Sequence, residues 1–252
     1  MVLVASLVAA TACTGSDPAG PAADQGPLMV GFPFTTYAHE DEPFAREVFA
    51  EHASQVRQVD DDELFFVGTD TDLRYTHVDG VERRSMPAVP GAPEVWFFGG
   101  STLFGVGQRD EHTIPSEVAR IAEREGTPVT VHDFGWSAYM AWQEVGLLRR
   151  LVEERGAPDL LVFFHGLNDF SSLCRHMAAS VSPLARTNPL TDMQLEDSSP
   201  VLDCFADPER TGEVLAGVVE ASILEVGAMA PGVRSSSSGS PLRTASAVPL
   251  RG

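Results

Sequence analysis

The middle of the chain alternates short apolar runs with longer amphipathic segments. Three of these runs, at 95–98, 129–132 and 160–164, have the length and composition of buried strands. The segments between them, at 114–125 and 141–155, predict helices. Strands and helices that alternate in this order are typical of β-α-β units around a parallel sheet. The pattern therefore predicts an α/β domain with right-handed connections.

Each predicted helix gathers apolar residues on one face. In the first helix these are Ile114, Val118 and Ile121, and in the second they are Val145, Leu148 and Val152, which we expect to point inward.

The segment 28–92 has a different character and predicts an accessory unit before the main domain at 93–226. A helix is expected at 43–56, and Asp79-Gly80 between two polar strands predicts a hairpin, because this dipeptide supplies the positive φ of a tight turn. The acidic run at 60–63 is expected to be a solvated face, with a metal site as the alternative.

Beyond Asp169 the regularity fades through 171–208, and a helix is expected again at 209–226. The segment 227–252 has no acidic residue and is rich in serine and arginine. Its composition predicts a disordered, solvated tail.

The first residues are apolar and small, too short a run to span a bilayer, and end at Cys13. This resembles a bacterial lipobox, which implies a signal at 1–13, a lipid anchor on Cys13 and a flexible tether at 14–27. Such signals usually have a basic residue before the apolar run, and this chain has none there. The alternative is an ordinary apolar strand or helix at the N-terminus.

With Cys13 set aside, Cys174 and Cys204 remain as an even pair. In an oxidising compartment they would form one disulfide, and the alternative is two free thiols.

The formal charge of −19 gives the molecule a negative field, which repels phosphate backbones. We therefore expect no nucleic-acid partner.

Each predicted strand of the main domain runs into residues that suit chemistry. The first leads into Gly99-Gly100-Ser101, the second into Gly135, and the third into Gly166-x-Asn168-Asp169. In open parallel sheets ligands bind beyond the carboxyl ends of the strands, which is where these residues fall.

These three motifs, in this order, resemble the first conserved blocks of the SGNH (GDSL-like) hydrolases over residues 95–170. The resemblance implies a three-layer α/β/α sandwich with a flavodoxin-like parallel sheet, in strand order 2-1-3-4-5. It implies Ser101 as the nucleophile of acyl transfer, without a metal or other cofactor. The oxyanion donors would be the N–H groups of Ser101 and Gly135 and the side-chain amide of Asn168. Where such families often carry asparagine before this glycine, the chain has Asp133 and Phe134.

The motif residues also have structural interpretations. A serine after glycines at a strand-to-helix junction serves equally as a helix N-cap or in a phosphate-cradling turn, although the chain contains no lysine for a Walker-type P-loop. Asp169 is expected to order its loop. His165 is expected to be a hydrogen-bonded core residue, with a catalytic role as the alternative.

The resemblance also implies a C-terminal D-x-x-H motif carrying the general base, and no such motif follows the third strand. The sheet is therefore expected to be incomplete, with 160–164 as its exposed edge, and a frameshift in the gene is one hypothesis for the tail. The expected function is an impaired esterase, lipid-anchored outside the cytoplasm, that acts on acyl or acetyl esters of small molecules or carbohydrates. The alternative is a non-catalytic lipid-anchored protein that binds ligands in the same cleft.

Overall fold

The computed structural model describes residues 2–6, 42–165 and 167–178, and single positions or short stretches between 186 and 227. The predicted anchor Cys13, the tether at 14–27 and most of the predicted tail lie outside the described residues. Of the helix expected at 209–226, only scattered positions are described.

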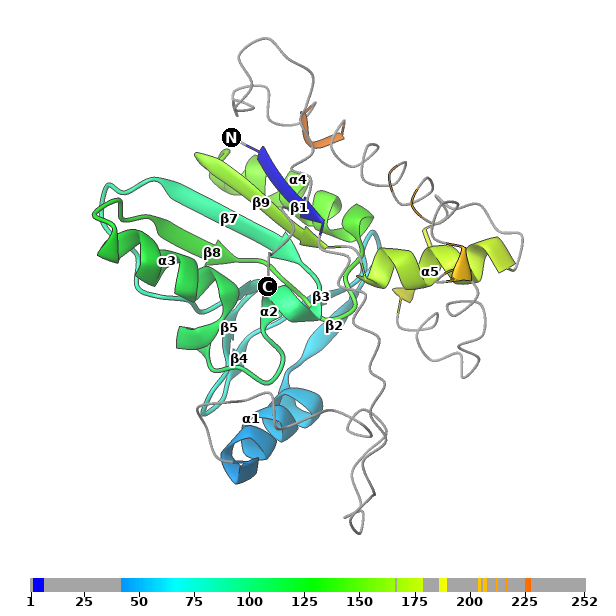
Figure 1. Cartoon of the computed structure of the whole chain (residues 1–252), viewed down its shortest axis with the longest axis horizontal. Helices are drawn as coiled ribbons and strands as arrows, with labels where there is room; N and C mark the ends of the chain where they lie inside the picture. The colour runs from blue at the N-terminus through cyan, green and yellow to red at the C-terminus, as the bar shows by residue number, and fades with distance from the viewer. Residues whose placement is uncertain are drawn as a thin grey trace.

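The described part of the chain is a mixed α/β structure (Figure 1). Its strands are β1 (Val2–Ser6), β2 (Gln58–Asp61), β3 (Phe65–Gly68), β4 (Thr71–Asp72), β5 (His77–Asp79), β6 (Glu82–Arg83), β7 (Glu94–Gly99), β8 (Thr130–Asp133) and β9 (Leu160–His165). Its helices are α1 (Glu42–Gln55), α2 (Ser101–Phe104), α3 (Ile114–Arg124), α4 (Ala141–Arg155) and α5 (Leu167–Ala178), with a 3₁₀ turn at Asp110–His112.

The main sheet has the order β1-β9-β7-β8-β6-β5-β4. The strands β8, β7, β9 and β1 are parallel to one another, and β6, β5 and β4 continue the sheet beyond β8 in antiparallel pairing. The three predicted strands of the main domain are confirmed, and the first lies between the other two. Figure 1 shows α5 beyond the end of the sheet at which β9 stops.

Alternating side chains of β7 divide the core into two layers. Trp96 and Phe98 face the apolar residues of α4, and Phe98 stacks between Phe134 and Phe163, with ring centroids 5.3 Å from each. Val95 and Phe97 point to the opposite face and share a smaller cluster with Ala119 of α3. Both faces of β7 are therefore covered, as a strand buried in a parallel sheet requires.

The accessory segment begins with α1, which matches its predicted position within one residue. The hairpin of β5 and β6 also forms at the predicted turn, where Gly80 has a φ of 59°. Through the pairing of Arg83 with Asp133, this hairpin joins the main sheet at β8.

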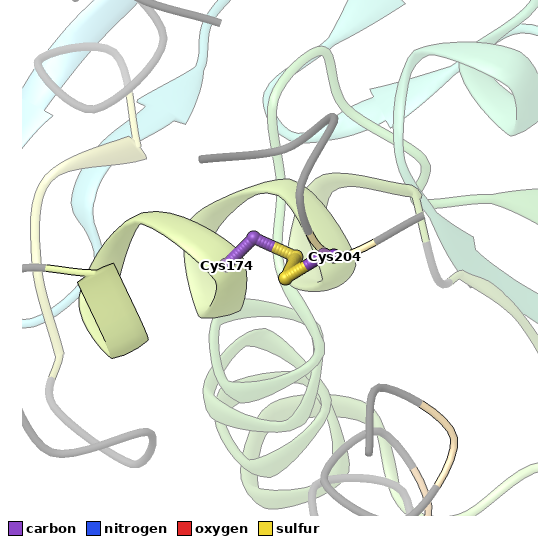
Figure 2. Close-up of a disulfide and its surroundings, with 2 residues drawn as sticks. All are labelled: Cys174 and Cys204. Carbon is purple, nitrogen blue, oxygen red and sulfur yellow. A yellow bond between two sulfur atoms is a disulfide. The ribbon is translucent and has the colours of Figure 1, made fainter. Parts of the chain in front are cut away.

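The helix α5 corrects the prediction that regular structure fades after Asp169. It runs for 12 residues and buries Phe170, Leu173 and Cys174. These residues stand at helical spacing, a signal that the following prolines and serines obscured. Cys174 forms a disulfide with Cys204, so the prediction of a disulfide is confirmed over that of two free thiols (Figure 2).

The apolar face predicted for α3 exists, but two of its three residues are not buried. Val118 is 36% exposed and Ile121 is 47% exposed, whereas Ser116 is fully buried. Ser116 is drawn inward because its hydroxyl donates to the carbonyl of Asp110 at 2.6 Å. Hydrogen bonding has therefore turned this helix away from the orientation that its apolar face favours.

The expectation that β9 is the exposed edge of the sheet is wrong for this structure. Val2–Ser6 forms a strand parallel to β9, with Val2 opposite Leu161 and Ser6 opposite His165. The first residues thus take the form of the alternative that the sequence left open, an apolar strand. No helix in the described ranges is long and apolar enough to cross a membrane.

Candidate active site

Ser101 occupies the first position of α2, directly after the glycine pair that ends β7. Both glycines have close neighbours. A β-carbon at Gly99 would collide with the carbonyl oxygen of Phe164, so this position requires glycine. One at Gly100 would lie 2.7 Å from Nδ2 of Asn168, a side chain that it would displace. Gly100, and not Ser101, is the N-cap residue of α2. The N-cap interpretation of Ser101 is therefore wrong.

Asn168 lies in the first turn of α5, immediately beyond the end of β9. Its Nδ2 donates to the carbonyl oxygen of Tyr139 at 2.8 Å. A side-chain amide has two N–H donors, so this bond orients the group and uses only one of them. The remaining N–H is the one that the predicted chemistry needs.

Asp169, the next residue of α5, makes a second contact with the segment around Tyr139. Its Oδ1 accepts the backbone N–H of Ala141, the first residue of α4, at 2.9 Å. The start of α5 is thus tied at two successive residues to the turn that precedes α4. The prediction that Asp169 orders this loop is confirmed.

Gly135 packs against the backbone of α2. A β-carbon at this position would lie 2.7 Å from the nitrogen of Phe104, so only glycine allows this approach. The N–H of Gly135, however, donates to Oδ1 of Asp133 at 2.9 Å. The structure brings Gly135 to the Ser101 turn, with its N–H already engaged by a neighbouring carboxylate.

Three residues further along, Ala138 has a φ of 66° and is almost fully buried. An alanine in the left-handed region is uncommon and costs about 1 kcal/mol or more. It is held there by the turn that presents the Tyr139 carbonyl to Asn168. Strain is therefore stored in the segment that orients the candidate amide donor.

Asp133 is a fully buried carboxyl, and burial raises its pKa to about 7. The charge of Arg83 and the hydrogen bond from Gly135 oppose this shift, while Asp110 and Glu82 add to it. Its Oδ2 has no hydrogen-bond partner among the described residues. A pKa near 7 means that Asp133, which accepts a hydrogen bond from the N–H of Gly135, changes its protonation near neutral pH.

None of the described histidine side chains is hydrogen-bonded to the Ser101 hydroxyl. The hydrogen bonds of these histidines go to other groups, in His52, His77, His112, His132 and His176. The backbone of His165 ends β9, but its side chain lies outside the described set. The described histidines therefore identify no general base for Ser101.

The acidic run at 60–63 forms ion pairs. Asp61 and Glu63 contact Arg150, and Glu63 also contacts Arg149. Within the ranges that the structure describes, no group of three or more histidine, cysteine, aspartate or glutamate side chains is arranged to hold a metal ion.

Two further residues contribute to the site without a signal in the sequence. Tyr139 acts through its backbone carbonyl, which any residue type would supply. Arg83, from the accessory hairpin, is fully buried against the loop after α2. The sequence of a polar hairpin predicts that its arginine is exposed to solvent. Only the three-dimensional structure shows that this side chain is buried.

No protein-family profile matches the chain, and no curated protein matches it. Among solved structures, it is similar to the crystal structure of AlinE4, described as an SGNH-hydrolase family esterase. The identity is 14%, the TM-score is 0.35, and the match covers 62% of this chain and 89% of the other. Two variants of that esterase match to the same extent, at 14% and 13% identity. A similarity at this level assigns neither a family nor a function to the chain.

Proposed function

We propose that the chain is a serine ester hydrolase of the SGNH type. Ser101 attacks the acyl carbon, and its own N–H together with the Asn168 amide stabilises the oxyanion. The observation that carries this proposal is the placement of Asn168, whose Nδ2 lies against the residue before Ser101 and is oriented by the Tyr139 carbonyl. A single such donor is typically worth about 3 kcal/mol of activation free energy.

The proposal gives Gly135 two roles. It leaves room for α2 to approach β8, as the 2.7 Å distance from its virtual β-carbon to the nitrogen of Phe104 indicates. It becomes a third oxyanion donor only when its N–H leaves Asp133. We further propose that Ser101 has no efficient general base, since the described histidine side chains are hydrogen-bonded to other groups. Turnover should then be slow, because loss of the base in a catalytic triad costs several orders of magnitude.

The test is hydrolysis of 4-nitrophenyl acetate, combined with labelling by a fluorophosphonate probe. The parent chain should show slow hydrolysis and one labelled serine, and Ser101→Ala should lose both. Asn168→Ala should lower the rate by about 100-fold or more, in line with loss of one oxyanion donor. Ser54→Ala, which changes an exposed serine of α1, is the matched control and should leave both signals intact.

Equal hydrolysis by the parent chain and Ser101→Ala would overturn the proposal. Binding of an ester without hydrolysis in either protein would instead favour the non-catalytic alternative.

We also propose that the protein acts outside the cytoplasm, anchored through lipid on Cys13, with acyl or acetyl esters of small molecules or carbohydrates as substrates. The Cys174–Cys204 disulfide supports an oxidising compartment. Expression with a labelled fatty acid tests the anchor, since label should enter the parent chain and not Cys13→Ala. Absence of label from both would contradict it.

A further inference from the structure

Several hydrogen bonds hold the loop that follows Ser101 to the accessory segment. The helix α2 is only one turn long, and the N–H groups of Gly105 and Val106 return to the carbonyl of Ser101 at 3.0 and 3.1 Å. So short a helix has little stability of its own. Its geometry must therefore be fixed by what contacts the residues after it.

The largest of these contacts is the guanidinium of Arg83. Its Nη1 donates to the carbonyls of Phe104 and Gly105, the second at 3.0 Å, and its Nη2 donates to the carbonyl of Gln108 at 2.6 Å. Its Nε donates to Asp110 at 3.1 Å. The side chain is fully buried, and its Cζ lies 4.7 Å above the ring of Phe104. A planar fork with donors in fixed directions suits this set of carbonyls, and an ammonium group does not.

Two further contacts come from the same segment. Nδ1 of His52 accepts the N–H of Gly107 at 2.7 Å, and the N–H of Asp110 donates to the carbonyl of Tyr75 at 3.2 Å. Burial, and next the charge of Arg83, lowers the pKa of His52 to about 3. The imidazole is therefore neutral and keeps the lone pair that this bond requires.

We propose that Arg83 is a positioning residue for the nucleophile: by binding the carbonyls at the end of α2, it sets the direction of the Ser101 side chain. The catalytic part of this inference rests on the proposed function. The accessory segment is then a working part of the active site.

The first test uses NMR to measure amide hydrogen exchange at Gly105 and Val106, in the parent chain and in Arg83→Lys. This variant keeps the positive charge beside Asp110 and removes the fork. Exchange at both amides should accelerate, while the amides of β7 and β9 stay protected. The matched control is Arg150→Lys, which removes a comparable fork on α4, bound to Asp61 at 2.7 Å, and should leave both amides unchanged.

The second test separates positioning from stability through steady-state kinetics on 4-nitrophenyl acetate. Arg83→Lys should lower kcat by about 100-fold, the loss that a misplacement of about 1 Å produces, with KM within about two-fold of the parent value. A variant that was merely less stable would lose active protein without changing the rate of fluorophosphonate labelling per folded molecule.

If Arg83→Lys fails to fold, Asp110→Asn is the second variant. It weakens the carboxylate contacts to Nε of Arg83 and to His77, so the guanidinium is held less firmly and exchange of the same two amides should accelerate to a smaller extent. Unchanged exchange of Gly105 and Val106 in a folded variant overturns the inference. Faster exchange with an unchanged labelling rate overturns its catalytic part. If the parent chain neither hydrolyses ester nor labels at Ser101, the proposed function fails, and the exchange data still decide whether Arg83 fixes the turn.

Discussion

Gly100 and Asn168 lie so close that a β-carbon at position 100 would stand 2.7 Å from the Asn168 amide nitrogen. Gly100 has a φ of −83°, which alanine adopts without strain, so the main effect of Gly100→Ala is to displace that amide. We expect kcat for nitrophenyl acetate to fall by about 100-fold with a small loss of stability. Steady-state kinetics and thermal unfolding measure the two effects.

The control for Gly100→Ala is Gly126→Ala. Gly126 has a φ of +73° and no heavy atom within 4 Å of its virtual β-carbon. This variant should cost about 1 kcal/mol in backbone strain and leave kcat unchanged. If Gly100→Ala retained the parent kcat, the amide of Asn168 would have no part in the reaction.

Asp133 predicts an unusual dependence of stability on pH. Its pKa rises from 3.8 to about 7 on folding, so the folded chain binds the proton more tightly than the unfolded chain does. The free energy of unfolding should therefore fall as the pH rises from about 4 to about 7, and remain lower above that range. Asp133→Asn should remove this fall and be the more stable protein at pH 8, by at most about 4 kcal/mol. Urea unfolding of both proteins between pH 4 and pH 8 measures the difference.

Asp61 is the comparison, because its contribution to stability should change with pH in the opposite direction to that of Asp133. Hydrogen bonds from Arg150 hold its pKa below the ordinary value of 3.8, so its contribution is present above that value and is lost as the pH falls. Asp61→Asn should therefore be less stable than the parent at pH 7, with a deficit that shrinks below about pH 4. A parallel pH response of the two variants would contradict the burial of Asp133.

The disulfide predicts a redox-dependent stability. Cys174 and Cys204 are 30 residues apart in sequence, and closing a loop of that size stabilises the folded state by roughly 3 kcal/mol in the chain-entropy model. A reductant should lower the melting temperature of the parent chain and leave that of a Cys174→Ser/Cys204→Ser variant unchanged. An unchanged melting temperature of the parent would show that the bridge adds no stability.

The exposed face of α3 should tolerate polar substitutions. Ile121→Gln should change the free energy of unfolding by less than about 0.5 kcal/mol, because the side chain is already 47% exposed. Val131→Ala, in the cluster beneath α3, should cost about 1–3 kcal/mol by removing buried methyl groups. Chemical denaturation of both variants checks the contrast, and a large loss for Ile121→Gln would mean that this face is covered in solution.

Periodicity alone was enough to predict three strands and two helices of the main domain, β7, β8, β9, α3 and α4, because apolar runs and amphipathic segments of these lengths are typical of such elements. The tight turn at the glycine pair before Ser101 could also be predicted, since a close approach of two backbone segments needs a residue without a side chain. The orientation of α3 was not readable, because the hydrogen bond from Ser116 to Asp110 depends on a loop that no local pattern describes. The apolar spacing in α5 was present, but the turn-forming residues after it suggested irregular structure.

The site was predictable only where side-chain type determines the chemistry. Ser101 and Asn168 could be named as candidates because their motifs follow strand ends and resemble those of the SGNH hydrolases, and their roles stay a proposal. The engagement of Gly135 by Asp133 depends on a rotamer, and the burial of Arg83 depends on how a hairpin joins the sheet. Such long-range geometry leaves no signature in a single sequence.

The pairing of Arg83 with Asp133 has a consequence for how the protein unfolds. One continuous sheet crosses the proline-rich segment 87–93, which resembles a domain boundary in the sequence. The accessory segment and the α/β domain should therefore melt in a single cooperative transition, as one foldon. A fragment that begins at residue 93 would leave β8 with an unpaired edge, prone to self-association, and would also lack the guanidinium that binds the loop after Ser101.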